Sequence, residues 1–117
     1  MAETIEDTLY TLEQGFWTGG DDFYRTHLDD WCLTVFPEMT ALLDREKIAQ
    51  QVGDTKWGDL VMTRKGYLSL APDFAIICYE SSANRGDRDY RALVSSGYVR
   101  RGEDWKMAFH QQTPLNS

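Results

Sequence analysis

Apolar residues recur at helical spacing near the start of the chain. Four of them follow one another at steps of four, three and four residues: Ile5, Leu9, Leu12 and Phe16. This spacing places them on one face of an amphipathic helix. Gly19-Gly20 would end that helix, and Asp21 or Asp22 could cap the start of a second one by accepting hydrogen bonds from free backbone N–H groups. The second helix would bury Phe23, Tyr24 and Leu28.

The middle of the first half predicts a strand and a third helix. The stretch WCLTVFPEM, residues 31–39, is rich in β-forming residues and is interrupted by Pro37, which indicates a short strand and then a bend. In the following segment, LLDREKIAQQVG, Asp44 is a good helix N-cap, and Gly53 lies just past the last periodic residue. Asp29-Asp30, ahead of the strand, would end the second helix and start a turn.

After Gly53 the pattern changes to long β-forming runs separated by turn residues. The breaks fall at 71–73, 84–87 and 101–104, so four extended runs follow one another as a meander. Helices followed by an antiparallel sheet are typical of an α+β domain with the helices packed on one sheet face. A chain of 117 residues fits one such domain, spanning 1–117.

Tight turns predict which side chains share a face of the sheet. Two-residue turns at Gly86-Asp87 and Gly102-Glu103 would place Ala75 beside Tyr98, and Tyr98 beside Met107. The face predicted to meet the helices then holds Ile77, Tyr79, Val94, Ser96, Tyr98, Trp105, Met107, Phe109 and Gln111. The opposite face would hold Ile76, Cys78, Leu93, Ser95, Gly97, Ala108 and His110, and a one-residue slip would exchange the two sets along a strand.

The opposite face is as poor in charge as the face that meets the helices. A sheet face left to water normally alternates to polar residues, so this pattern predicts that something covers it. We expect a homodimer packed sheet against sheet.

Composition narrows the class of partner. The chain has 19 acidic and 12 basic residues, a net charge of -7, which disfavours nucleic acid. Five arginines gather in the second half, and we interpret them as the solvated rim of the sheet in preference to an anion site: Arg85, Arg88, Arg91, Arg100 and Arg101.

Cysteine usage and hydropathy indicate a cytoplasmic protein without a membrane partner. Cys32 and Cys78 lie in apolar stretches and lack metal or disulfide spacing, as expected of free thiols in a reducing compartment. The N-terminus has no apolar signal core, and the longest apolar run, 74–79, is far shorter than the roughly 20 residues that span a bilayer.

The last hairpin carries a family resemblance. SSGYVRRGEDWKMAFHQQTP, residues 95–114, together with the order of elements along nearly the whole chain, resembles the nuclear-transport-factor-2-like (NTF2-like) superfamily, in its SnoaL-like and ketosteroid-isomerase-like branch of small bacterial proteins. The resemblance implies a cone, also called a cystatin-like roll, in which a curved antiparallel sheet wraps around the N-terminal helices and leaves a pocket at its open end. It also implies a class of isomerases, dehydratases, cyclases and noncatalytic ligand-binding or assembly domains, often dimeric.

Acid/base catalysis in such a pocket would use a carboxylate with tyrosine or histidine donors, as the resemblance implies. The candidates are Asp30, Glu80 and His110, and each has a structural alternative. Asp30 can end a helix, Glu80 can pair with a rim arginine, and His110 can be a hydrogen-bonded interface residue. His27 and His110 stand far apart without further ligands at metal spacing, so we expect no metal and no other cofactor.

The favoured function is binding of a small, mostly apolar or aromatic molecule in an aromatic pocket. The expected lining is Phe16, Trp31, Trp57, Tyr79, Ser96, Tyr98, Phe109 and Gln111. Two alternatives stay open: a cofactor-free isomerase, dehydratase or cyclase, and a dimerising interaction module without a ligand.

Overall fold

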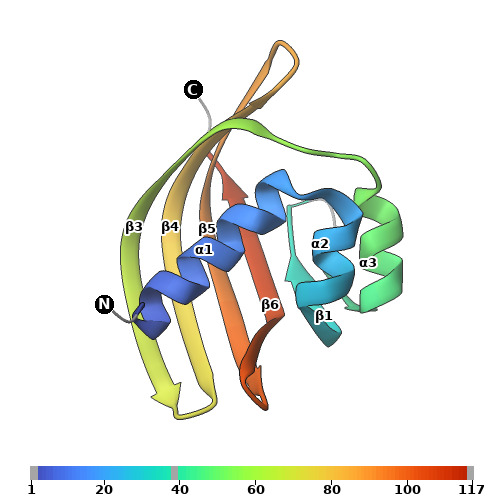
Figure 1. The fold of residues 1–117 in the computed structure, drawn as a ribbon. Coiled ribbons are helices and arrows are strands. Elements are labelled where there is room, and N and C mark those ends of the chain that lie inside the picture. Colours follow the sequence, from blue (N-terminus) through green and yellow to red (C-terminus); the bar gives the residue numbers. More distant parts are fainter. Residues whose placement is uncertain (1–2, 38–39, 116–117) are drawn as a thin grey trace.

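The computed structural model describes residues 3–37 and 40–115, and in these ranges the chain forms helices packed on a curved sheet (Figure 1). The helices are α1 (Ile5–Thr18), α2 (Gly20–His27) and α3 (Arg45–Val52). The strands are β1 (Leu28–Val35), β2 (Thr40–Asp44), β3 (Gly58–Ala71), β4 (Phe74–Arg85), β5 (Arg88–Arg101) and β6 (Asp104–Pro114). Within the described ranges, no helix combines the length and the apolar character needed to cross a membrane.

The six strands form one sheet in the order β2-β1-β6-β5-β4-β3, and α1 lies across its concave side (Figure 1). This arrangement confirms the α+β class and the meander from β3 to β6. The expectation of a purely antiparallel sheet was wrong in one place, because β1 runs parallel to β6. The meander leaves one edge of β6 unpaired, and β1 covers that edge.

The segment after α2 differs from the prediction. β1 begins at Leu28, so Asp29 and Asp30 lie within a strand and do not form a turn. Leu28 itself caps the C-terminus of α2 in an extended conformation and is buried, so the chain passes directly from helix to strand. The predicted strand over residues 31–39 therefore starts earlier and ends at Val35, while residues 38–39 lie outside the described residues.

Side-chain caps fix the ends of the helices that face the sheet. The Thr4 hydroxyl accepts a hydrogen bond from the backbone N–H of Asp7 at the start of α1. The Asp44 carboxylate accepts one from the backbone N–H of Lys47 over 2.9 Å at the start of α3, as predicted. Gly53 ends α3 with a φ of 53°, a conformation that glycine adopts without steric cost.

The register of β4 and β5 confirms the turn at Gly86-Asp87. Tyr79 pairs with Val94, and Ala75 pairs with Tyr98. Alternate residues of β4 are therefore buried under α1, and the most deeply buried large side chains of the core are Leu9, Leu28, Ile77, Tyr79 and Tyr98.

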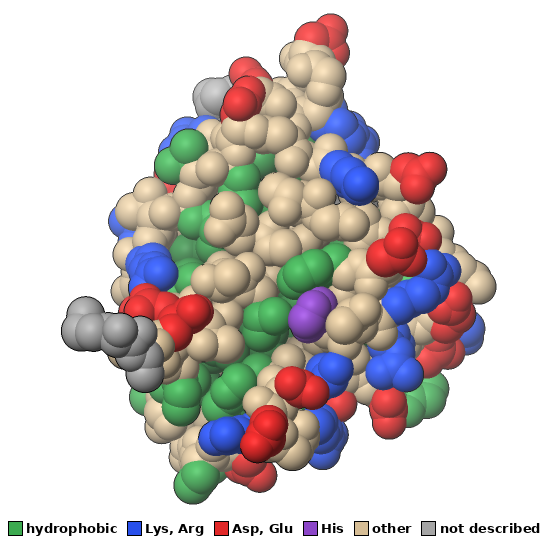
Figure 2. Space-filling view, in the orientation of Figure 1, with side chains coloured by type: hydrophobic (Ala, Val, Ile, Leu, Met, Phe, Trp, Pro, Cys, Tyr) green, Lys and Arg blue, Asp and Glu red, His purple; other side chains and the backbone are tan. Residues whose placement is uncertain are grey.

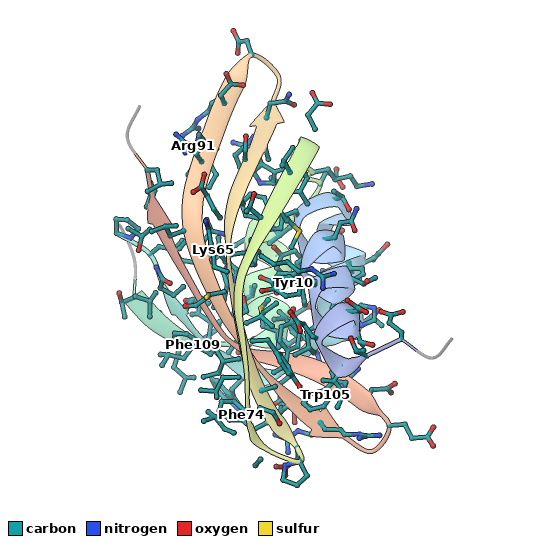
Figure 3. The ribbon with its side chains drawn as sticks, turned by 90° about the vertical axis from the view of Figure 1, so that its left-hand side faces the viewer. Tyr10, Lys65, Phe74, Arg91, Trp105 and Phe109 are labelled. Atoms are coloured by element: carbon teal, nitrogen blue, oxygen red, sulfur yellow. The ribbon has the colours of Figure 1, made fainter. Side chains whose placement is uncertain are left out.

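A β-bulge in β6 changes the second half of that strand. Tyr98 pairs with Met107 as predicted, but Gly97 then pairs with Phe109 and Ser96 with His110, so Ala108 is an extra residue. The predictions that Phe109 and Gln111 face the helices and that His110 faces away were therefore wrong. Figure 3 shows Trp105, before the bulge, on the helix side of the sheet and Phe109, after it, on the outer side.

Candidate functional site

A cavity of about 330 Å³ lies between the helices and the concave side of the sheet. Its apolar lining includes Phe16 and Trp17 from α1, Leu28 and Cys32 from β1, and Ile48 from α3. Trp57, ahead of β3, and Met107 of β6 also line it, so most elements of the fold contribute to the wall, whose other apolar members are Phe36, Leu43 and Val52. A concave, largely apolar wall with a few polar side chains is typical of small-molecule sites.

The polar side chains that line the cavity are Tyr24, Thr34, Gln51, Thr55, Arg85, His110 and Gln112. His110 and Gln112 reach it because the bulge at Ala108 turns both toward the helices. The His110 side chain is 13% exposed. Outside the cavity, on the protein surface, charged side chains gather over α2 and α3 (Figure 2), where Arg25 pairs with Asp21 and Glu46.

The predicted lining residues fall into three groups. Phe16 and Trp57 line the cavity. Three others lie in the buried core and do not line it: Tyr79, Ser96 and Tyr98. The remaining three lie on the outer side of the sheet, where Trp31 is 56% exposed: Trp31, Phe109 and Gln111.

A buried carboxylate stands among those core residues. Glu13, on the face of α1 that meets the sheet, is 0% exposed. Its Oε1 accepts hydrogen bonds from the Tyr79 hydroxyl over 2.8 Å and from the Ser96 hydroxyl over 2.6 Å, and its Oε2 accepts one from the Tyr98 hydroxyl. Three donors compensate the burial of this charge.

The hydrogen bonds continue from Glu13 to the cavity through His110. Ser96 Oγ lies 2.8 Å from His110 Nδ1, and His110 Nε2 lies 2.9 Å from the side-chain nitrogen of Gln112. Because the Ser96 proton is donated to Glu13, Ser96 Oγ accepts from Nδ1–H of His110. Nε2 is then the acceptor, which matches the N–H donor of Gln112, whose oxygen accepts from the Tyr90 hydroxyl over 2.7 Å. The chain of bonds holds His110 as one neutral tautomer.

Burial and the Glu13 carboxylate set the protonation of this network. Burial raises the pKa of Tyr79 and of Tyr98 well above the ordinary value, and the nearby charge of Glu13 raises it further. Both phenols therefore remain donors. Burial lowers the pKa of His110, while Glu13, 3.5 Å from Nδ1, opposes that shift. His110 is the titratable group through which the network reaches the cavity.

The two carboxylates proposed from sequence lie elsewhere. The side chain of Asp30 is 82% exposed, and its nearest cation is Arg45 at 3.4 Å. Glu80 pairs with Arg91 over 2.9 Å, the rim ion pair that the sequence offered as its alternative. Neither residue lines the cavity, so the structure does not bring them together with His110.

Sequence reasoning missed Glu13, although a signal for it exists. Glu13 lies four residues after Leu9 and three and four residues before Phe16 and Trp17, which places it on the apolar face of α1. A carboxylate on such a face needs buried partners. Within the described residues, no group of three or more His, Cys, Asp or Glu side chains could hold a metal ion.

Comparison with known proteins identifies the fold. No family model matches the chain, and no curated protein matches it by sequence. Among solved structures, a candidate ketosteroid isomerase from Parabacteroides distasonis superposes with a TM-score of 0.77 at 15% identity, covering 97% of this chain and 90% of that one.

Two further solved structures agree with that fold. An NTF2-like protein of unknown function from Prochlorococcus gives a TM-score of 0.75 at 18% identity, covering 98% and 96% of the two chains. A candidate calcium/calmodulin-dependent protein kinase type II association domain from Thiobacillus denitrificans gives 0.72 at 18% identity, covering 97% and 96%. The chain therefore has the NTF2-like fold, as the resemblance of its last hairpin implied.

Proposed function

We propose that this chain, with its NTF2-like fold, binds a small, mostly apolar molecule in the cavity between the helices and the sheet. The observation that supports this most directly is the apolar cavity of about 330 Å³ into which His110 and Gln112 project. Its volume lies at the lower end of the range of small-molecule sites, roughly 300–1,000 Å³. The polar pair would orient a ligand, and the aromatic wall would supply most of the affinity.

A neutral fluorescent probe, N-phenyl-1-naphthylamine, tests this proposal. Val52 of α3 lines the cavity, so Val52→Trp should fill part of it and abolish the rise in probe fluorescence. Gln50→Trp, at an exposed position of the same helix, is the matched control and should bind like the unmodified protein. Equal fluorescence from all three proteins, or none from the unmodified protein, would show that the cavity is not a binding site.

Acid/base catalysis is the second candidate, favoured by the hydrogen-bonded chain from Glu13 through Ser96 to His110. Once a substrate displaces the Gln112 amide, Nε2 of His110 could take a proton from a carbon next to a carbonyl group. The electron pair of the broken C–H bond would move onto the carbonyl oxygen, which gives an enolate. The imidazolium would keep its Nδ1–H bond to Ser96 and be stabilised by the Glu13 carboxylate. Return of that proton to another carbon would complete an isomerisation.

Exchange of a carbon-bound proton tests the catalytic candidate. In deuterium oxide, the protein should accelerate loss of the α-proton signal of 2-tetralone, measured by proton magnetic resonance. His110→Gln should remove the acceleration, and His27→Gln on α2 should retain it, because His27 does not line the cavity. Identical rates with and without the protein would leave binding as the function.

We also propose a homodimer formed through the outer side of the sheet. Two adjacent rows of register partners cross all six strands there without a charged residue. The first row is Leu42, Leu33, Phe109, Gly97, Ile76 and Leu68, and the second is Thr40, Val35, Gln111, Ser95, Cys78 and Gly66. Leu42, Leu33 and Leu68 are 61%, 42% and 55% exposed. Each chain carries a net charge of -7, so two copies repel each other least when the surfaces that meet are uncharged. This uncharged surface therefore suits a second copy of the chain.

Light scattering after size exclusion tests the dimer. The unmodified protein should have twice the 13.5 kDa mass of one chain. Leu33→Glu should give single chains, whereas Gln14→Glu, exposed on α1, should not. A dimer that survives Leu33→Glu would place the interface elsewhere.

Cys32 and Cys78 are both free, which supports the proposal of a reducing, cytoplasmic location.

A further inference from the structure

The lining of the cavity has an unexpected charge. The chain contains 19 acidic and 12 basic residues, yet among the described residues that line the cavity Arg85 is the only formally charged side chain, leaving aside the titratable His110. Within residues 3–37 and 40–115, no acidic side chain lines the cavity. The described part of the cavity wall in this acidic protein therefore offers a ligand one positive charge and no negative charge.

An aromatic cluster positions this arginine at the cavity. The guanidinium carbon of Arg85 lies 4.9 Å from the centroid of the Trp57 ring. Trp57 in turn packs on Tyr90, with ring centroids 5.4 Å apart, and on the edge of Trp17, 5.8 Å away. A guanidinium stacked on an indole face keeps its N–H groups available at its edge.

Within residues 3–37 and 40–115, Arg85 has no carboxylate within ion-pair distance. Five other arginines do have one: Arg25, Arg45, Arg64, Arg91 and Arg101. Arg91 and Arg101 belong to the cluster that sequence reasoning interpreted as a solvated rim, and their ion pairs agree with that interpretation. Arg85 is exposed as well, but its guanidinium lies over the ring of Trp57, which lines the cavity.

A negative charge, that of the Glu13 carboxylate, lies next to His110. The Glu13 carboxylate is 3.5 Å from His110 Nδ1, on the side of the ring away from Gln112. An anionic group placed beside His110 would therefore be repelled by a buried carboxylate. An anionic ligand is favoured in one orientation only, with its charge at Arg85 and its uncharged end at His110.

We infer that the ligand of this cavity is an apolar acid, whose carboxylate pairs with Arg85 and whose hydrophobic body lies against Trp57 and the apolar wall. This inference rests on the proposed function and adds the chemical class of the ligand. An arginine binds a carboxylate through two parallel N–H donors, which fixes orientation as well as charge. Because Arg85 is exposed, its contribution is that of a partly solvated ion pair.

A matched pair of probes tests the inference by isothermal titration calorimetry at low ionic strength. 2-Naphthoate carries the carboxylate, and 2-naphthamide has nearly the same shape without the charge. The unmodified protein should bind 2-naphthoate about fivefold more tightly than 2-naphthamide, as expected for a partly solvated pair. Added salt should reduce that ratio, because it screens exposed charges.

Two arginine variants locate the effect. Arg85→Gln should bind the two probes equally, and Arg88→Gln should keep the preference, because Arg88 lies across the same turn without lining the cavity. Equal binding of both probes by the unmodified protein would overturn the inference and leave the proposed function standing. A preference for 2-naphthoate that survives Arg85→Gln would also overturn it. If neither probe binds the unmodified protein, the inference and the proposed function both fail.

Discussion

Glu13→Gln is the substitution that most directly perturbs the buried network. The side chain keeps its shape and loses its charge. Its carboxylate accepts hydrogen bonds from Tyr79, Ser96 and Tyr98, which are 1%, 0% and 0% exposed. None of these hydroxyls can turn to water when the acceptor is lost.

The magnitude follows from counting donors. The amide oxygen of glutamine can still accept from Tyr79 and Ser96, while its nitrogen must donate to the Tyr98 oxygen, which leaves the second amide N–H and the Tyr98 O–H without partners. An unsatisfied buried polar group costs about 1–3 kcal/mol, and hydrogen bonds to a charged group are each about 1 kcal/mol stronger than neutral ones. With two unpaired donors and two weakened bonds, we therefore expect Glu13→Gln to lower the free energy of unfolding by at least about 4 kcal/mol.

Urea unfolding followed by tryptophan fluorescence measures this loss. Gln14→Ala, at the exposed neighbouring position of α1, is the control and should change stability by less than about 0.5 kcal/mol. Tyr98→Phe, alone and combined with Glu13→Gln, completes a double-mutant cycle, in which we expect a coupling of about 1 kcal/mol or more. If the free energy of unfolding of Glu13→Gln lies within about 0.5 kcal/mol of that of the unmodified protein, the network does not hold α1 to the sheet.

Three further predictions concern pH, thiol reactivity and a helix cap. Burial lowers the pKa of His110 below the ordinary 6.5, so its contribution to stability is fully present above that pH and is lost as the pH falls toward the lowered pKa. His110→Gln should therefore flatten the decline in urea midpoint between about pH 7 and about pH 5, and equal slopes would contradict this. Burial raises the pKa of the Cys32 thiol to about 12, so it should react with an aromatic disulfide reagent more slowly than a peptide cysteine at pH 8, as measured in Cys78→Ser; a rate equal to that of the peptide would show that the thiolate forms freely. Asp44→Ala removes the cap on the Lys47 backbone N–H and should cost about 1 kcal/mol in thermal unfolding, while Asp54→Ala, beyond the end of α3, should cost almost nothing; equal losses would mean that the cap does not stabilise α3.

The sequence predicts those parts of the fold that depend on local spacing. The four apolar residues of α1, the cap at Asp44 and the turn at Gly86-Asp87 each have a near-neighbour pattern, and the structure confirms the elements they predict. The parallel pairing of β1 with β6 has no such pattern. It joins segments about seventy residues apart, and only the open edge left by the meander makes it favourable.

The site depends more on long-range features, so less of it could be predicted. The bulge at Ala108 inserts one residue at a point of β6 that no glycine or proline marks, and it exchanges the faces of His110 and Phe109. Phe16 and Trp57 could be chosen as large aromatics, and both line the cavity. Glu13 could have been identified from its position on the apolar face of α1, but its partners on β4, β5 and β6 appear only once the sheet is assembled.

A crystal structure of the protein grown with N-phenyl-1-naphthylamine tests the central claim most directly. We predict that the probe lies inside the cavity, with its rings between Trp57 and Met107 and its amine near His110 or Gln112. A probe found only on the outer side of the sheet, with the cavity closed by its own side chains, would contradict the claim that this chain binds small molecules within its fold.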